Sequence, residues 1–420
     1  IRSLDRAIAE KRFYPQSPPS AAGMTHIPRI VRPGSDARWL AEPEQPLAAG
    51  RQSCKSLAGT QQNGFQNHFY LETMAALAVP GENRSMTLYV TTQSLADNQY
   101  NAAGLLGVAA ADVRVIVSRD GGAFGGRQTR SRFVSAAAAL AAWVLQQPVR
   151  LVVDRNTNFV MFGERHPFRG DYHVAVAEDG RLAGLKVDFY SNAGNTYDVS
   201  FPVMDLCLLS ADACYQVDTY EVTAEVCQTN QLSNTAFRTF GSVQSTNIVE
   251  TALEHAAHAL GKRPEEIREK NLYRLGSRTP TGYRITEQTL DVLLAYGFAK
   301  KDVRALRPLR GKYYPDDGAF KAAVDARTSA FGATESWITL QDFSTTAYDY
   351  TPYLQSLQYC NVRRLWQECK EWSGFERRAA AVDAFNSENR FKKRGISMMP
   401  LKYGIAYTDR AGCSTKAGLT

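Results

Sequence analysis

The chain has 420 residues, of which 44% are hydrophobic and 22% are charged, a composition typical of globular proteins and unlike that of disordered chains. Its 49 basic and 42 acidic residues give a formal net charge of +7, and the excess is spread along the sequence rather than gathered into one block. The basic runs are poorly interleaved with stacking aromatic residues, so nucleic acid is not an expected partner.

The seven cysteines form neither a CxxC pair nor a zinc-binding spacing with the six histidines. An odd and scattered set of this kind is typical of reduced thiols in an intracellular protein. The basic pI of about 8.9 permits the mitochondrial matrix, and the cytoplasm is an equal alternative. The longest apolar stretch, residues 133–145, is shorter than the roughly 20 residues that a membrane-spanning helix needs. We therefore expect no membrane crossing and no metal held by protein side chains.

Residues 1–65 are interrupted by proline and glycine without a sustained period and are interpreted as a linker that leads into the first strand. Between residues 66 and 273, segments of β-branched or alternating apolar character alternate with helical periods. The expected strands are 86–92, 113–118, 149–154, 172–177, 185–191 and 222–227, and the expected helices are 131–145 and 244–260. This order predicts an α+β domain with a mixed sheet.

The rest of the sequence divides into two segments. Residues 274–350 carry aromatic clusters, for example in 292–298 and 331–343, which favour a packed segment over a free loop. Residues 351–420 contain a further expected strand at 400–405.

Residues 121–126, with the sequence GGAFGG, lie between the expected strand 113–118 and the expected helix 131–145. Glycines permit positive φ angles and close approach of the backbone to a ligand, and the free N–H groups at the start of a helix can face an oxyanion. The loop is therefore either an anion-binding corner or a plain connection between a strand and a helix.

The glycine loop continues as GGAFGGRQTRS, and a second string, TAFRTFG, follows at residues 235–241. Together these strings resemble the molybdenum hydroxylases, the family of xanthine dehydrogenase and aldehyde oxidase, in which a GGxFGG loop and an AFRxFG loop both reach the molybdopterin cofactor. Further strings at residues 68–73, 165–168, 191–195 and 270–273 follow the order and approximate spacing of the family. The resemblance covers the first half of the molybdopterin-binding domain.

The resemblance implies particular site residues. Gln93 matches a glutamine that hydrogen-bonds the molybdenum centre, while Phe124 and Gly125 match the loop whose backbone faces the cofactor. Arg238 matches an arginine beside the cofactor, and Phe240 matches a phenylalanine that contacts aromatic substrates. An amide, a tight backbone, a permanently charged guanidinium and a ring suit these roles. Each residue also has a purely structural interpretation as a turn, ion-pair or core residue.

Two positions depart from the xanthine dehydrogenase pattern. Gln128 stands where those enzymes have a glutamate, and Leu206 stands where they have an arginine that orients the substrate. The charged pair for purine recognition is therefore absent, as it also is in aldehyde oxidases. The catalytic glutamate of the family and its MGQG cofactor loop belong to the second half of the domain, so no catalytic residue is expected in this chain.

The plan of the family also divides the chain. Residues 1–65 would follow a preceding domain that this chain lacks, and 66–273 would form the molybdopterin-binding-like domain. Residues 274–350 would be a lineage-specific insertion, since the family has only a short connection there. Residues 351–420 would be the return segment of the same domain.

Two hypotheses remain open. In the first, the chain is a non-catalytic descendant with no bound cofactor, and it serves as a structural or docking subunit in a larger intracellular assembly of proteins. In the second, it is the molybdopterin-binding subunit of a split aldehyde oxidase-type oxidoreductase and binds molybdenum–molybdopterin. The absent second half and the insertion favour the first hypothesis, and the retained Gln93, Phe124, Arg238 and Phe240 favour the second.

Overall fold

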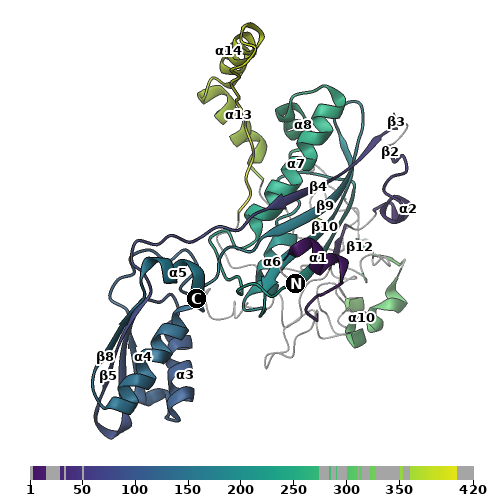
Figure 1. Cartoon of the computed structure of the whole chain (residues 1–420). Coiled ribbons are helices and arrows are strands. Elements are labelled where there is room, and N and C mark those ends of the chain that lie inside the picture. Colours follow the sequence, from purple (N-terminus) through teal and green to yellow (C-terminus); the bar gives the residue numbers. More distant parts are fainter. Residues whose placement is uncertain are drawn as a thin grey trace.

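The computed structural model describes residues 3–15, 29–32, 35–49, 52–273, 351–352 and 360–403, together with short pieces between 283 and 327. Figure 1 shows two sheet-containing lobes and a pair of helices that projects from the larger one. The larger lobe is built on a five-stranded sheet and the smaller lobe on a four-stranded sheet. The mixed sheets with packed helices confirm the predicted α+β class.

The sheet of the larger lobe has the strand order β1-β11-β10-β9-β4. Strands β10 and β11 are parallel, whereas the other neighbouring pairs are antiparallel. The strands are β1 (Arg29–Val31), β4 (Lys55–Asn63), β9 (Phe168–Val176), β10 (Leu182–Gly194) and β11 (Thr219–Gln228). The mixed sheet is therefore as predicted.

Both faces of this sheet are covered. On one face Ile248 packs where Gly170 leaves room, and on the other Trp39 packs against Gly184. The covering helices are α1 (Leu4–Ala9), α2 (Ala37–Ala41), α6 (Ser200–Leu208), α7 (Ser242–Leu260) and α8 (Pro264–Asn271). The central strands are consequently buried along most of their length, which suits their apolar runs.

The sheet of the smaller lobe has the order β7-β6-β5-β8. Its strands are β5 (Ala75–Pro80), β6 (Met86–Val90), β7 (Val113–Ile116) and β8 (Val149–Val152). Helices α3 (Leu95–Leu106) and α4 (Ser131–Leu145) pack on one face, and α5 (Arg155–Met161) follows β8. Burial alternates along β6, as expected for a sheet covered on one side only.

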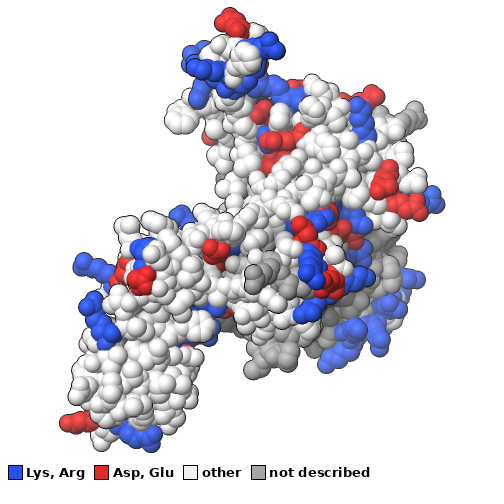
Figure 2. Space-filling model, in the orientation of Figure 1, with Lys and Arg blue, Asp and Glu red and all other residues white. Residues whose placement is uncertain are grey.

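The projecting pair consists of α13 (Val362–Trp372) and α14 (Phe375–Glu388). Two residues of α13 anchor it: Trp366 is buried, and the Arg363 guanidinium donates to the Leu272 carbonyl at 3.0 Å. Figure 2 shows basic side chains gathered over this pair. The remaining short elements are β2 (Ala48–Ala49), β3 (Gln52–Ser53), β12 (Tyr283–Arg284), α10 (Lys300–Leu306), β13 (Tyr313–Tyr314) and the 3₁₀ turns Glu82–Arg84, Ala110–Asp112 and Arg307–Leu309. In the described part of the chain, no helix combines the length and apolarity that crossing a membrane requires.

All six predicted strands and both predicted helices between 66 and 273 are present; the helix 131–145 has the predicted bounds, and the ends of the others are shifted. The structure corrects part of the linker prediction, because residues 55–63 form β4 and pair with β9. In the segment 274–350, Val303 and Leu306 are buried in the larger core, which agrees with a packed segment there. Residues 400–403 form no strand, and the rest of the strand expected at 400–405 lies outside the described residues, as do 292–298 and 331–343.

Candidate functional site

The glycine loop, residues 121–126, connects β7 to α4 through a backbone that few residues could adopt. Gly122 and Gly125 have φ angles of +94° and +100°, and Phe124 between them has φ of 52°. A Cβ atom on Gly125 would lie 2.5 Å from the carbonyl oxygen of Ala236. Gly125 is therefore required both by its dihedral angles and by its contact with the second loop.

Gln93 follows β6 and holds the glycine loop. Its Oε1 atom accepts hydrogen bonds from the backbone N–H groups of Gly125 at 2.9 Å and of Arg127 at 3.3 Å. The backbone N–H of Gln93 donates to the Arg127 carbonyl at 3.2 Å. Because the oxygen is used internally, the side-chain NH₂ group is the part of this exposed residue that can serve a ligand.

The second loop, residues 235–241, lies directly against the first. The Arg238 N–H donates to the Phe124 carbonyl at 2.9 Å, which joins two motifs that are more than a hundred residues apart in the sequence. The Arg165 guanidinium lies 3.9 Å from the Phe237 ring centroid and donates to the Arg238 carbonyl at 2.9 Å. Burial lowers the pKa of Arg165 to about 10.

His68 fixes the second loop from the other side. Its Nε2 atom lies 2.7 Å from the Ala236 carbonyl, and because a carbonyl can only accept, this nitrogen carries the proton. The ring also stacks on Phe237 with centroids 4.3 Å apart. Burial, more than the nearby charge of Arg165, lowers the pKa of His68 to about 4, so the ring is neutral at pH 7.

A third segment, which leads into α6, closes the cluster. The Asp198 carboxylate accepts from Arg130 at 3.2 Å and from the Thr129 hydroxyl at 3.0 Å, and Thr129 also contacts the Thr235 hydroxyl at 3.1 Å. Gly241, with φ of +103°, lies against the Val203 carbonyl in α6. The glycine loop, the second loop and the start of α6 therefore form one continuous cluster.

Two buried arginines also hold this cluster together. Arg127 is fully buried, lies 4.6 Å from the Tyr70 ring centroid, and donates to the Glu72 carbonyl. Arg130 donates to the carbonyls of Ser233 at 2.9 Å and Asn234 at 3.2 Å. The sequence analysis did not identify either residue, although both belong to the string GGRQTR, where two charges directly after a glycine loop were the available signal.

The structure places the residues implied by the resemblance in two groups. Gln93, Phe124, Gly125 and Arg238 are joined by the hydrogen bonds and the contact described above. The second group consists of half-buried residues, namely Gln128, Leu206 and Phe240. The backbone N–H of Gln128 donates to the Gly125 carbonyl at 3.0 Å. Leu206 belongs to α6, and Phe240 precedes Gly241 beside that helix.

The surface of the first group offers hydrogen-bond donors. The Arg238 side chain is exposed, and no carboxylate in the described residues pairs with it. Within the same part of the chain, no acceptor meets the backbone N–H of Phe124, which sits in the loop at a positive φ angle. Together with the NH₂ group of Gln93, these groups suit a ligand rich in oxygen acceptors.

The model of the molybdopterin cofactor-binding domain matches residues 42–272, which is more than half of the chain. The chain belongs to the molybdenum hydroxylase family. It is 35% identical over 346 residues to the xanthine dehydrogenase/oxidase of Felis catus, covering 82% of this chain and 21% of that protein. With the xanthine dehydrogenase of Dictyostelium discoideum it shares 29% identity over 408 residues, or 97% of this chain and 23% of that protein.

Solved structures agree on the fold. The aldehyde oxidoreductase from Desulfovibrio desulfuricans ATCC 27774 aligns with a TM-score of 0.53 and 19% identity, over 73% of this chain and 32% of that one. The quinoline 2-oxidoreductase from Pseudomonas putida 86 aligns with a TM-score of 0.51 and 21% identity, over 65% of this chain and 34% of that one. The chain thus spans about a fifth of the curated relatives named above and about a third of each of these structures.

The residues present fit a molybdopterin group. Gln93, Phe124 and Arg238 are exposed and keep donors free beside two loops that Gly125 allows to touch, and acceptor-rich ligands bind loops of this kind. In the described part of the chain, no three His, Cys, Asp or Glu side chains are grouped so that they could hold a metal ion.

Proposed function

We propose that this chain forms one wall of a molybdopterin site in an oxidoreductase of the aldehyde oxidase type. The observation that carries the proposal is the contact between the two family loops, in which the Arg238 N–H donates to the Phe124 carbonyl at 2.9 Å and Gly125 abuts Ala236. Contacts in the same cluster leave the donors of Gln93, Phe124 and Arg238 available to a ligand. A wall with this geometry is suited to binding oxyanions.

Each residue would contribute binding or orientation. Gln93 would donate from its NH₂ group to an oxo ligand, Phe124 would donate from its backbone, and Arg238 would supply a positive charge for an oxyanion. When bound, the molybdenum–molybdopterin group supplies the redox chemistry, as cofactors generally do. Gly125 leaves the contact between the two loops free of a side chain, and the hydrogen bonds of the cluster hold the three donors in place.

The substrate class follows from the second group of residues. Gln128 and Leu206 are uncharged, so they cannot make the contacts to a purine that a charged glutamate and arginine could make. Phe240 could offer a ring face to an aromatic substrate. We therefore propose a neutral aldehyde or aromatic heterocycle as the substrate, with the remaining parts of the enzyme supplied outside these 420 residues.

The competing hypothesis is a non-catalytic docking subunit without cofactor. It is supported by the internal contacts of the cluster, since Gln93 Oε1, Arg127, Arg130 and His68 hold the loops together whether or not a ligand is bound. A fold can persist after its site has lost function. The two hypotheses differ in the amount of cofactor bound to the native protein.

The test is the molybdenum content of the native full-length protein, measured by mass spectrometry together with the pterin released on denaturation. The proposal predicts about one molybdenum per site, and Arg238→Met should lower this content. A matched control, Arg38→Met, changes another exposed arginine on α2 and should leave the content unchanged. Native protein without molybdenum or pterin would support the docking hypothesis instead.

A further inference from the structure

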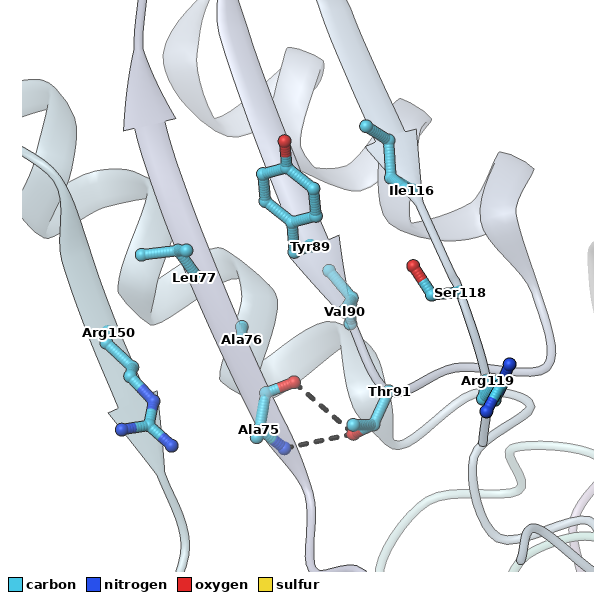
Figure 3. A pocket seen from close by; sticks show the side chains of 10 residues that line it. All are labelled: Ala75, Ala76, Leu77, Tyr89, Val90, Thr91, Ile116, Ser118, Arg119 and Arg150. Atoms are coloured by element: carbon cyan, nitrogen blue, oxygen red, sulfur yellow. Dashed lines mark hydrogen bonds between the residues drawn. The ribbon is translucent and has the colours of Figure 1, made fainter. Parts of the chain in front are cut away.

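The smaller sheet has one face that no helix covers in the described part of the chain. The strand register places Arg150, Leu77, Tyr89 and Ile116 in one row across β8, β5, β6 and β7. Their chain neighbours Ala76 and Leu88 are buried in the core under α3 and α4, so this row points to the other side. Figure 3 shows these side chains on the open face.

A shallow hollow of about 200 Å³ lies along this row. Its apolar centre is formed by Leu77, Tyr89 and Ile116, and Figure 3 shows Arg150 at one margin and Arg119 at the other. The Tyr89 side chain is 45% exposed in this position, and the neighbouring Val152 is 48% exposed. Apolar surface of this kind, placed between two cations, needs an explanation beyond folding.

The cations at the margins have no partners in the chain as described. Arg119 and Arg150 are exposed, as is Arg114 at the other end of β7. Among the described residues, no carboxylate forms an ion pair with any of the three. Thr91, in contrast, is satisfied internally, because its hydroxyl accepts from the Ala75 N–H at 2.9 Å. The face thus combines an apolar centre with an unpaired basic margin.

This combination fits a protein partner better than a small molecule. A small ligand usually occupies a concave pocket that buries most of its surface, whereas this hollow is shallow and open. Protein interfaces have an apolar centre with a polar rim, and tyrosine and arginine are enriched among the residues that dominate their binding energy. The charge of the margin requires that the partner be acidic.

We infer that this open face docks an acidic segment of a partner protein. Carboxylates of the segment pair with Arg119 and Arg150, and an aliphatic or aromatic side chain between them packs on Leu77, Tyr89 and Ile116. Arg119 lies two residues before Gly121, so the docked segment sits beside the entry to the glycine loop. This inference rests on the sheet face and remains valid whether or not the chain binds molybdopterin.

The test uses the full-length protein and a short fluorescein-labelled peptide that is rich in glutamate and contains one phenylalanine and one leucine. Binding is followed by fluorescence anisotropy at about 0.15 M salt, where distant charges are screened beyond about 8 Å. The double variant Arg119→Glu/Arg150→Glu should weaken binding about tenfold. Tyr89→Ser, which removes part of the apolar centre, should weaken it about threefold.

The matched control is Arg38→Glu/Arg378→Glu, which makes the same change in net charge at exposed positions on α2 and α14 and should leave the affinity within about twofold. Equal weakening by the control would show that binding depends on net charge alone and would overturn the inference. Binding of inorganic phosphate at Arg119 and Arg150 without peptide binding would mean a small-anion site. A wild-type dimer that the first double variant dissociates would mean that a second copy occupies the face.

Discussion

The two lobes bury their sheets differently. In the larger lobe, Trp39 covers one face and Ile248 the other, so a strand such as β10 is buried along most of its length. In the smaller lobe, the buried residues of β6 alternate with more accessible ones, and Tyr89 is exposed on the uncovered face. The difference indicates that the larger lobe serves as a closed scaffold and the smaller lobe retains a surface for contacts.

The candidate site depends on both lobes. The glycine loop belongs to the smaller lobe, between β7 and α4, and the second loop belongs to the larger lobe, between β11 and α7. They meet at Gly125 and Ala236 and at the hydrogen bond from Arg238 to Phe124. A change that loosens either lobe should therefore affect the site, but changes on the uncovered face should not.

The largest loss of stability is expected when the buried ion pair of the larger lobe is broken. Arg268 is 1% exposed and donates to Glu250 at 2.7 Å, so Arg268→Met leaves a buried carboxylate without its cation. We expect a loss of about 3–5 kcal/mol in the free energy of unfolding, measured by urea denaturation. Lys270→Met is the control, because its pair with Asp179 is 42% exposed on both sides and contributes at most about 1 kcal/mol. Equal losses would contradict the closed-scaffold description.

The next largest loss of stability should distinguish the two faces of the smaller sheet. Leu88 is fully buried under the helices, so Leu88→Ala should cost about 2–5 kcal/mol in the same denaturation experiment. Tyr89→Ala, at the adjacent but exposed position, should change stability by no more than about 0.5 kcal/mol. A loss at Tyr89 as large as that at Leu88 would show that the face called open is covered.

A smaller, pH-dependent change in stability is expected from His68, which lies where the lobes meet. The pKa of His68 is lowered from 6.5 to about 4, so between these values the unfolded chain binds more protons than the folded one. Stability conferred by neutral His68 is complete above pH 6.5 and is lost as the pH falls toward 4, by up to about 3 kcal/mol. His68→Gln should flatten this part of the stability profile. A profile that His68→Gln leaves as steep as in the wild type would contradict this assignment.

The sequence predicted several buried elements because their signals are strong, but it missed β5, an inner strand of the smaller sheet. The Ala-rich helix 131–145 has the predicted bounds, and the apolar runs at 185–191 and 222–227 lie within β10 and β11. Strand β4 was missed because it lies at an edge, where its sequence KSLAGTQQN needs few apolar side chains. Helix α3 was missed because LADNQYNAAGLL buries mainly small residues and Asn98.

The site could be predicted only as a set of motifs. The strings GGAFGG and TAFRTFG identified Gly125 and Arg238, but no local pattern shows that the loops of the two lobes touch. The supporting contacts, such as Arg130 to Asp198 and His68 to Ala236, join residues far apart in the sequence. Such pairings depend on tertiary packing, which a single sequence does not specify locally.

Whether contact between the lobes builds the proposed molybdopterin wall is tested by the molybdenum content of two glycine variants of the native protein. Gly125→Ala places a methyl group against the Ala236 carbonyl at a φ of +100°, whereas Gly104→Ala in α3 places one in open space. The molybdenum content of both variants is measured on the folded fraction below the thermal transition of each. We expect Gly125→Ala to lose most of its molybdenum and Gly104→Ala to retain it. Full retention by Gly125→Ala would show that the contact between the lobes does not build the site.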